Sequence, residues 1–149
     1  MTQDLQELIA SLVEHNVEFL VVGSAVLAFY GRPRYTEDID FWLRKSRENV
    51  DRLADALTAF GTPVNRNALY VLADQHDKMI VLGSAPQAVD ILNHIAGLDF
   101  EEAWTSRMMG TLFGSEVAFL SKEDFIKSKR AAGRKKDLLD LAILEEMEG

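Results

Sequence analysis

The stretch of sequence that decides the fold runs from Phe19 to Leu43 and reads FLVVGSAVLAFYGRPRYTEDIDFWL. Its nearly continuous apolar beginning predicts a strand over 17–22 that is covered on both faces. The strand stops at Gly23-Ser24, and a short helix is expected over 24–30, before a basic loop leads into a second strand. Backbone N–H groups and a hydroxyl at this turn form a suitable site for a phosphate group.

The second strand carries two carboxylates. Asp38 and Asp40 are separated by one residue, so their side chains are expected on the same face, whereas Ile39 and Phe41 face the other way into a core. Like charges this close repel each other, and a divalent cation that prefers hard oxygen ligands, Mg²⁺ or Mn²⁺, would compensate them. Two alternatives stay open: the pair is exposed at a strand edge, or a nearby arginine neutralises it without a metal.

This combination resembles a known superfamily. A strand that ends in Gly-Ser, followed by an Asp-x-Asp strand, is similar to the polymerase-β-like nucleotidyltransferases. The string GSAVLAFYGRPRYTEDIDFWL resembles their small bacterial branch, which is related to AbiEii-type toxins and minimal nucleotidyltransferases. The segments VDILNHIAGLDFEEAW and FIKSKRAAGRKKDLLDLAIL extend the resemblance over most of the chain.

The resemblance implies roles for residues outside the first stretch. Asp90, in the apolar segment QAVDIL, would be the third acidic residue: a metal ligand that also helps to activate the attacking hydroxyl as general base. Lys129 of KSKRAAGRKKD would face the triphosphate, with Arg134 and Asp137 as supporting structure. The alternatives are that Asp90 caps a neighbouring loop and that Lys129 is one of several solvated lysines.

By the same resemblance, Gly23 and Ser24 would hold the triphosphate. The alternative is a plain strand-to-helix turn with Ser24 as N-cap. The chain departs from the pattern directly afterwards, because Ala25 stands where minimal enzymes often have an arginine. Lys129 or nearby loop residues would then have to supply the phosphate contacts, although one of these residues could instead cap the loop. The loop candidates are Arg32, Arg34 and Thr36.

Acidic residues outnumber basic ones by 24 to 16, and the net charge of −8 argues against a broadly basic nucleic-acid-binding surface. Twelve of the sixteen basic residues nevertheless lie in two short blocks, which are either solvated faces or a positive rim around an anionic substrate. The first block, around the Asp pair, contains Arg32, Arg34, Arg44, Lys45 and Arg47, and the second contains Lys122, Lys127, Lys129, Arg130, Arg134, Lys135 and Lys136.

Several function classes are disfavoured by residues that the sequence lacks. It has no cysteine, which excludes disulfides and thiolate metal sites and fits a cytoplasmic protein. The three histidines, His15, His76 and His94, are scattered without ligand-type spacing, so a zinc site is not expected. No apolar run approaches the roughly 18 residues that span a membrane, and the acidic beginning is unlike a signal peptide.

The remaining periodicities complete an α+β fold: a small, mixed, nucleotidyltransferase-like β-sheet with helices packed on it. One domain is expected over 1–149, with the helices after about 121 packed on the core. The expected helices cover 3–15, 48–59, part of 67–73, 99–107, 121–131 and 135–146. The expected strands after the Asp strand cover 78–82, 88–92, 109–113 and 116–119.

The sequence therefore predicts a Mg²⁺-dependent nucleotidyltransferase that moves a nucleoside monophosphate from an NTP to an acceptor hydroxyl and releases pyrophosphate. The acceptor is an RNA or tRNA end, a protein side chain or a small molecule, and a second subunit or a cognate partner protein is expected to complete its site. The alternative is a non-catalytic nucleotidyltransferase-fold binding protein or toxin–antitoxin component. A metal-dependent phosphohydrolase is less favoured, because histidine-rich ligand sets are absent.

Overall fold

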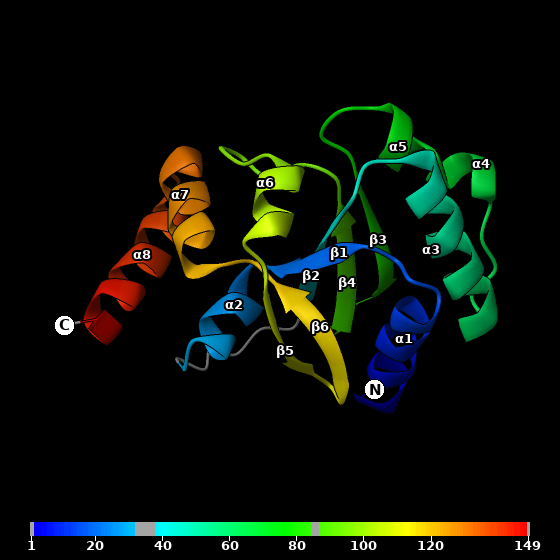
Figure 1. Ribbon diagram of the computed structural model, residues 1–149, viewed down its shortest axis with the longest axis horizontal. Helices are drawn as coiled ribbons and strands as arrows, with labels where there is room; N and C mark the ends of the chain where they lie inside the picture. Colours follow the sequence, from blue (N-terminus) through cyan, green and yellow to red (C-terminus); the bar gives the residue numbers. More distant parts are fainter. Residues whose placement is uncertain (1, 32–37, 85–86, 149) are drawn as a thin grey trace.

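The computed structural model of the chain describes residues 2–31, 38–84 and 87–148, and the side chains of 3–31, 39–83 and 88–146. Within these ranges the strands form a single six-stranded sheet in the order β3-β4-β2-β1-β6-β5 (Figure 1). The strands are β1 (Phe19–Val22), β2 (Asp38–Leu43), β3 (Met79–Ser84), β4 (Gln87–Leu92), β5 (Met108–Leu112) and β6 (Ser115–Phe119).

The sheet is mixed, as the sequence predicts. The central strands β1 and β2 pair antiparallel, while β2 pairs parallel with β4 and β1 pairs parallel with β6. The outer strands β3 and β5 each pair antiparallel with their inner neighbour. This arrangement confirms the predicted α+β class.

Helices cover both faces of the sheet. In Figure 1, α1 and α3 lie on one side, and α2, α6, α7 and α8 lie on the other. The helices are α1 (Thr2–Glu14), α2 (Ser24–Phe29), α3 (Arg47–Phe60), α4 (Arg66–Leu69), α5 (Val71–Asp74), α6 (Phe100–Thr105), α7 (Lys122–Ala132) and α8 (Lys135–Glu148). Within the described part of the chain, no helix has the length and apolarity needed to cross a lipid bilayer.

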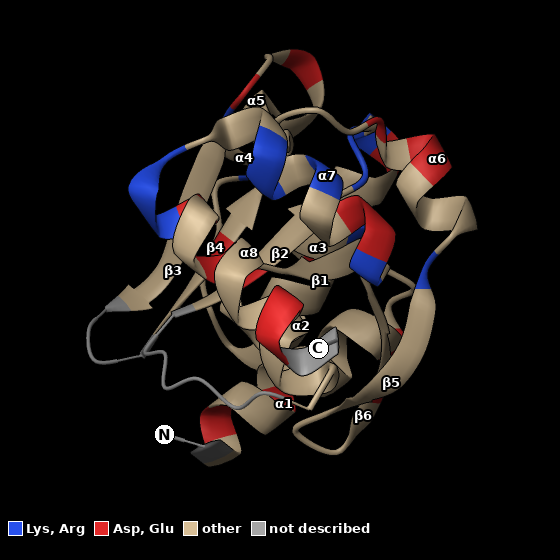
Figure 2. Ribbon diagram, turned by 90° about the vertical axis from the view of Figure 1, so that its left-hand side faces the viewer, with Lys and Arg blue, Asp and Glu red and all other residues tan. Residues whose placement is uncertain are grey.

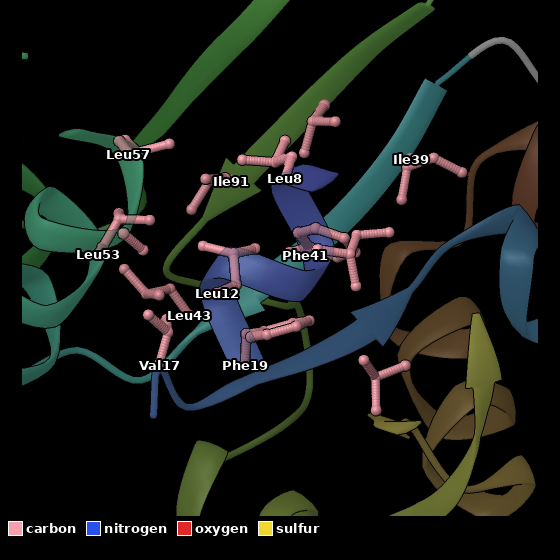
Figure 3. Packing of buried hydrophobic residues seen from close by; sticks show 14 of the residues in the cluster. Leu8, Leu12, Val17, Phe19, Ile39, Phe41, Leu43, Leu53, Leu57 and Ile91 are labelled. Atoms are coloured by element: carbon pink, nitrogen blue, oxygen red, sulfur yellow. The ribbon is translucent and has the colours of Figure 1, made fainter. Parts of the chain in front are cut away.

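The larger core lies between the sheet and helices α1 and α3. Alternate residues of β2, namely Ile39, Phe41 and Leu43, enter it and meet residues such as Leu12 and Leu53 (Figure 3). Burial of each such apolar side chain stabilises the folded state by about 1.5–3 kcal/mol. This packing fixes the register of β2, because a shift by one residue would bring the aspartates into the apolar core.

A second core lies on the opposite face of the sheet. There, Val22 and Trp42 pack with α2, α6, α7 and α8, and Phe125 and Leu144 anchor the last two helices to the sheet. Asp40 belongs to this face, because it lies two residues before Trp42 and pairs with Val22. The acidic residues therefore lie at the boundary of a packed core, beside the C-terminal helices.

Most helix ends agree with the sequence. The side chains of Asp99 and Ser121 accept hydrogen bonds from Glu102 N and Asp124 N, and so cap α6 and α7. Gly61 ends α3 in the left-handed region of backbone space. The strand expected from residue 17 begins only at Phe19.

The segment over 64–77 differs from the single short helix expected there. Two one-turn helices, α4 and α5, form instead, and a distant side chain holds α5 in place. The Asn93 Nδ2 donates hydrogen bonds to Leu72 O at 3.0 Å and Gln75 O at 2.7 Å, while its Oδ1 accepts one from Lys78 N at 2.8 Å. Asn93 thus ties this loop to the end of β4, next to the cleft described below.

Candidate active site

Two carboxylates meet on adjacent strands of the sheet. The parallel register of β2 and β4 makes Asp40 and Asp90 direct partners, so both side chains project from the same face, one strand spacing of about 4.8 Å apart. Both residues are half-buried. Among the described residues, the Asp90 side chain has no hydrogen bond or ion pair. We call Asp40 and Asp90 the carboxylate pair.

The other member of the predicted Asp-x-Asp pair, Asp38, is described only by its backbone. Asp38 is the first residue of β2, and its backbone pairs with Ala88 of β4. Its side chain lies outside the described ones, so its convergence with the carboxylate pair stays a prediction.

A glycine allows the turn after β1 to lie directly against Asp40. Gly23 has φ 73° and ψ −151°, a combination that is essentially restricted to glycine. A Cβ at this position would collide with Oδ2 of Asp40 and lie 3.3 Å from its Cγ. Gly23 itself caps α2 without a side-chain hydrogen bond, so the alternative in which Ser24 is the N-cap is wrong.

The Gly-Ser turn opens onto a cleft of about 440 Å³ between the sheet and helices α7 and α8. Gly23, Ser24 and Asp40 line one wall, and Lys129 and Lys136 line the other. Asp90 adjoins Asp40 but does not line the cleft itself. The structure therefore brings together four of the predicted site residues, while the predicted contacts Arg32, Arg34 and Thr36 lie outside the described residues.

Lys129 is held by two buried carboxylates. Its Nζ lies 3.2 Å from Asp137 Oδ1 and 3.2 Å from Asp140 Oδ2, and both aspartate side chains are only 1% exposed. The Arg134 Nε donates to Asp137 Oδ2 at 2.7 Å. We call Lys129, Arg134, Asp137 and Asp140 the ion cluster. Its two cations and two carboxylates balance, so the cluster positions the Lys129 ammonium without adding net positive charge.

The ion cluster strongly favours the charged form of Asp137. Hydrogen bonds from the Arg134 guanidinium, and then from Lys129, lower the pKa of Asp137 from 3.8 to about 2, although burial opposes the shift. Asp137 contacts both Lys129 and Arg134, and its supporting role at a triphosphate site stays a prediction.

Asp140 is the member of the ion cluster that the sequence motifs do not single out. The available signal was its spacing, because Asp137, Asp140 and Leu144 follow each other by three and four residues and so share one helix face. Two aspartates on the face of a helix that also buries a leucine indicate an internal cation partner, which is Lys129.

Of the two alternatives for the first basic block, a positive rim around an anionic substrate is wrong for Arg44 and Arg47. Both follow the far end of β2, and the strand separates them from its acidic beginning by about 3.3 Å per residue. Arg44 pairs with Glu18 and Glu101, and Arg47 pairs with Asp74 at 2.6 Å. In contrast, the second basic block contributes Lys129, Arg134 and Lys136 to the lining of the cleft.

Two of the three histidines are not scattered in space. The rings of His76 and His94 lie 4.5 Å apart between centroids, and His94 lines the cleft. Nevertheless, the described side chains contain no group of three or more His, Cys, Asp or Glu residues that could hold a metal ion. The structure thus gives no support to a histidine-based metal site in its described part.

One comparison with known proteins identifies a family for this chain. The model of the family "Nucleotidyl transferase of unknown function (DUF2204)" matches residues 1–149. The chain belongs to this family. No curated protein and no solved structure matches the chain. The membership of this DUF2204 protein confirms the broad nucleotidyltransferase family indicated by the Gly-Ser turn and the Asp-x-Asp strand.

The residues of this DUF2204 protein fit a divalent cation. Asp40 and Asp90 provide hard oxygen ligands on neighbouring strands, the donor type that Mg²⁺ and Mn²⁺ prefer. The missing side chain of Gly23 leaves the space that the Asp40 carboxylate fills. A cation would also relieve the repulsion between the two carboxylates, which neighbouring like charges on a sheet otherwise experience.

Proposed function

We propose that this protein is a Mg²⁺-dependent nucleotidyltransferase that transfers a nucleoside monophosphate from an NTP to an acceptor hydroxyl and releases pyrophosphate. The observation that carries the proposal is the register of Asp40 with Asp90 beside Gly23, at the wall of a cleft. The family membership supports the same class of reaction.

In this proposal Asp40 and Asp90, with Asp38 as third ligand, hold Mg²⁺ or Mn²⁺. When bound, the cation neutralises the phosphate oxygens and promotes the displacement at phosphorus. Gly23 lets the backbone approach the triphosphate closely, and the Ser24 hydroxyl donates a hydrogen bond to it.

Asp90 accepts the proton of the acceptor hydroxyl. The hydroxyl oxygen then bonds to the α-phosphorus, while the bond from that phosphorus to the bridging oxygen breaks and pyrophosphate leaves with this oxygen. Across the cleft, Lys129 and Lys136 face the triphosphate, and Asp137 and Asp140 fix the direction of Lys129. The loop residues Arg32, Arg34 and Thr36 are proposed as further phosphate contacts.

The acceptor is proposed to be an RNA or tRNA end, a hydroxyl of a protein, or a small molecule. The resemblance to AbiEii-type toxins and minimal nucleotidyltransferases supports a place in a toxin–antitoxin pair, in which the cognate protein or a second subunit completes the acceptor site. Besides the sheet and α7–α8, the cleft is lined by loop residues that include Asp77, His94 and Ile95.

The first test is calorimetric titration of each of the four NTPs, with and without Mg²⁺. We expect metal-dependent binding by the wild type and at least about tenfold weaker binding by Asp40→Asn, because a metal ligand is lost. The matched control is Asp4→Asn, which removes an exposed carboxylate on α1 and should leave binding unchanged. A folded wild type that binds no NTP, or binds equally as Asp40→Asn, would contradict the proposal and favour a non-catalytic binding protein.

The second test separates binding from chemistry. Labelled NTPs are incubated with candidate RNA, protein and small-molecule acceptors, and both label transfer and pyrophosphate release are measured. Asp90→Asn is expected to lower the transfer rate by about 10²–10⁴-fold, more than it weakens NTP binding, because the general base is removed. Equal losses of binding and rate would instead make Asp90 a metal ligand without a role as base.

A further inference from the structure

Helix α8 uses one face internally and leaves the other exposed. Its inner face buries Asp137, Asp140 and Leu144. On its outer face, Leu138 is 55% exposed and Leu139 is 56% exposed. Nothing in the described part of the chain covers these two leucines, so their role is not explained by the fold.

The charges of the outer face follow a simple order. Lys135 lies at the beginning of α8 and Glu145 near its end, and both are exposed. Together with Leu138 and Ala142, they are spaced by three, four and three residues, which places all four on one face. Figure 2 looks onto α8 and shows basic residues at its beginning and acidic residues in its last turns.

This order is unfavourable for the isolated helix. The beginning of a helix carries a partial positive charge and its end a partial negative charge, so Lys135 and Glu145 each oppose the macrodipole. Neither has an ion pair among the described residues that would explain its position. The stripe of Lys135, Leu138, Ala142 and Glu145, which we call the outer stripe, is nevertheless complementary to a reversed copy of itself.

We propose that the outer stripe of α8 binds the outer stripe of a second copy of this chain, with the two helices antiparallel about a two-fold axis near position 140. Lys135 then faces Glu145 of the partner subunit, and Leu138 faces Ala142 of the partner subunit. The small alanine allows the helices to approach closely, and the antiparallel arrangement pairs opposite ends of the two helix dipoles.

A second copy explains the outer stripe better than an unrelated partner. A partner of independent sequence needs no match between the two ends of this helix, whereas an isologous contact uses each residue twice and requires it. The inner face of α8 meanwhile keeps Lys129 in place at the cleft. One helix thus serves the cleft on one side and the dimer on the other, and the proposal does not depend on nucleotide transfer.

The test uses sedimentation equilibrium of the full chain over a range of concentrations. Lys135→Glu alone and Glu145→Lys alone should each weaken self-association by about tenfold or more, because each turns both symmetry-related ion pairs into like-charge contacts. An equimolar mixture of the two variants should associate about as tightly as the wild type, since every pair in that heterodimer again has opposite charges. A parallel arrangement would instead place Lys135 beside Lys135 of the partner subunit and Glu145 beside Glu145 of the partner subunit. In that case neither variant alone would weaken association relative to the wild type, and the mixture would associate more tightly than the wild type.

The controls separate this contact from general charge effects and from misfolding. Lys45→Glu makes the same charge change at an exposed position outside α8 and should leave self-association unchanged. Leu138→Ser with Leu139→Ser should abolish the dimer while the circular dichroism spectrum is kept. A wild type that is monomeric at about 1 mM, a mixture that does not rescue, or α8 contacts made only with a different protein would each overturn the proposal.

Discussion

The carboxylate pair and the ion cluster both place aspartates at the cleft, but they treat charge in opposite ways. In the ion cluster, Asp137 and Asp140 each contact a cation, and the charges balance within the protein. In the carboxylate pair, Asp40 and Asp90 lie side by side on neighbouring strands. The comparison teaches that the first arrangement balances its charges within the folded chain, whereas the second brings two like charges together, and it is there that we propose the cation binds.

The largest effect is expected from Asp137→Asn, which keeps the shape of the side chain but removes its charge. Lys129 and Arg134 then lose a shared partner, and breaking a buried ion pair costs about 3 kcal/mol of the free energy of unfolding. Urea denaturation of the wild type and the variant measures this difference in the free energy of unfolding. Asp55→Asn removes an exposed partner of Arg66 and is the matched control, with little change expected. Equal stability of the two variants would show that the ion cluster is not a stabilising unit.

Gly23→Ala is expected to have the next largest effect, at about 2–3 kcal/mol of stability. The alanine would adopt a backbone conformation that only glycine tolerates, and its Cβ would push against the Asp40 carboxylate. Gly61→Ala is the control, since Gly61 also has a positive φ, of 105°, but nothing lies within 4 Å of its added Cβ. Thermal unfolding should show a larger loss of stability for Gly23→Ala than for Gly61→Ala. NTP titration should show loss of binding for Gly23→Ala alone.

The low pKa of Asp137 makes stability depend on acidity. Its pKa of about 2 in the folded state lies below the usual 3.8, so its contribution is complete above about pH 4 and disappears as the pH falls through about 2. This pKa shift corresponds to a contribution of about 2 kcal/mol to the free energy of unfolding. Denaturation curves between about pH 5 and 2 should therefore show a steeper loss for the wild type than for Asp137→Asn. Parallel curves would mean that other carboxylates control acid unfolding.

The smallest effect has the opposite sign. Asp90→Asn removes one of two neighbouring like charges and should raise the free energy of unfolding by about 0.5 kcal/mol in the absence of divalent cations. Mg²⁺ should raise the melting temperature of the wild type more than that of the variant. The same Asp→Asn change thus stabilises at the carboxylate pair and destabilises in the ion cluster. Destabilisation at both places would remove the distinction between the two regions.

Much of the fold follows from local sequence patterns. Alternation along DIDFWL and the 3.6-residue period of α1 and α3 predict these elements to within about two residues, because burial of one face decides both patterns. The structure of the segment over 64–77 is not predicted by such local patterns, because it depends on hydrogen bonds from the side chain of Asn93, which lies further along the chain. No local pattern reports such a hydrogen bond.

The site is predictable to a lesser degree, for a related reason. The order of the motifs along the chain predicts that Gly23 and Asp40 lie close together. Asp90 is the one charged residue in an apolar strand, which predicts that its side chain lies on the same face of the sheet as that of Asp40. Proximity in sequence misleads for Arg44, because an extended strand carries it away from the acidic end of β2. The motifs do not predict Asp140, because its role depends on how α8 packs against Lys129 on α7.

The sheet topology also has a consequence for the order of folding. Strands β1 to β4 form contacts among residues 19–92, so the carboxylate pair can assemble early, during or soon after synthesis of that segment. In contrast, β1 meets β6 across about 100 residues, and the ion cluster forms only when the last two helices are present. Contacts between segments far apart in the sequence form more slowly than local ones, so the carboxylate pair is expected to form before the wall of the cleft that faces it.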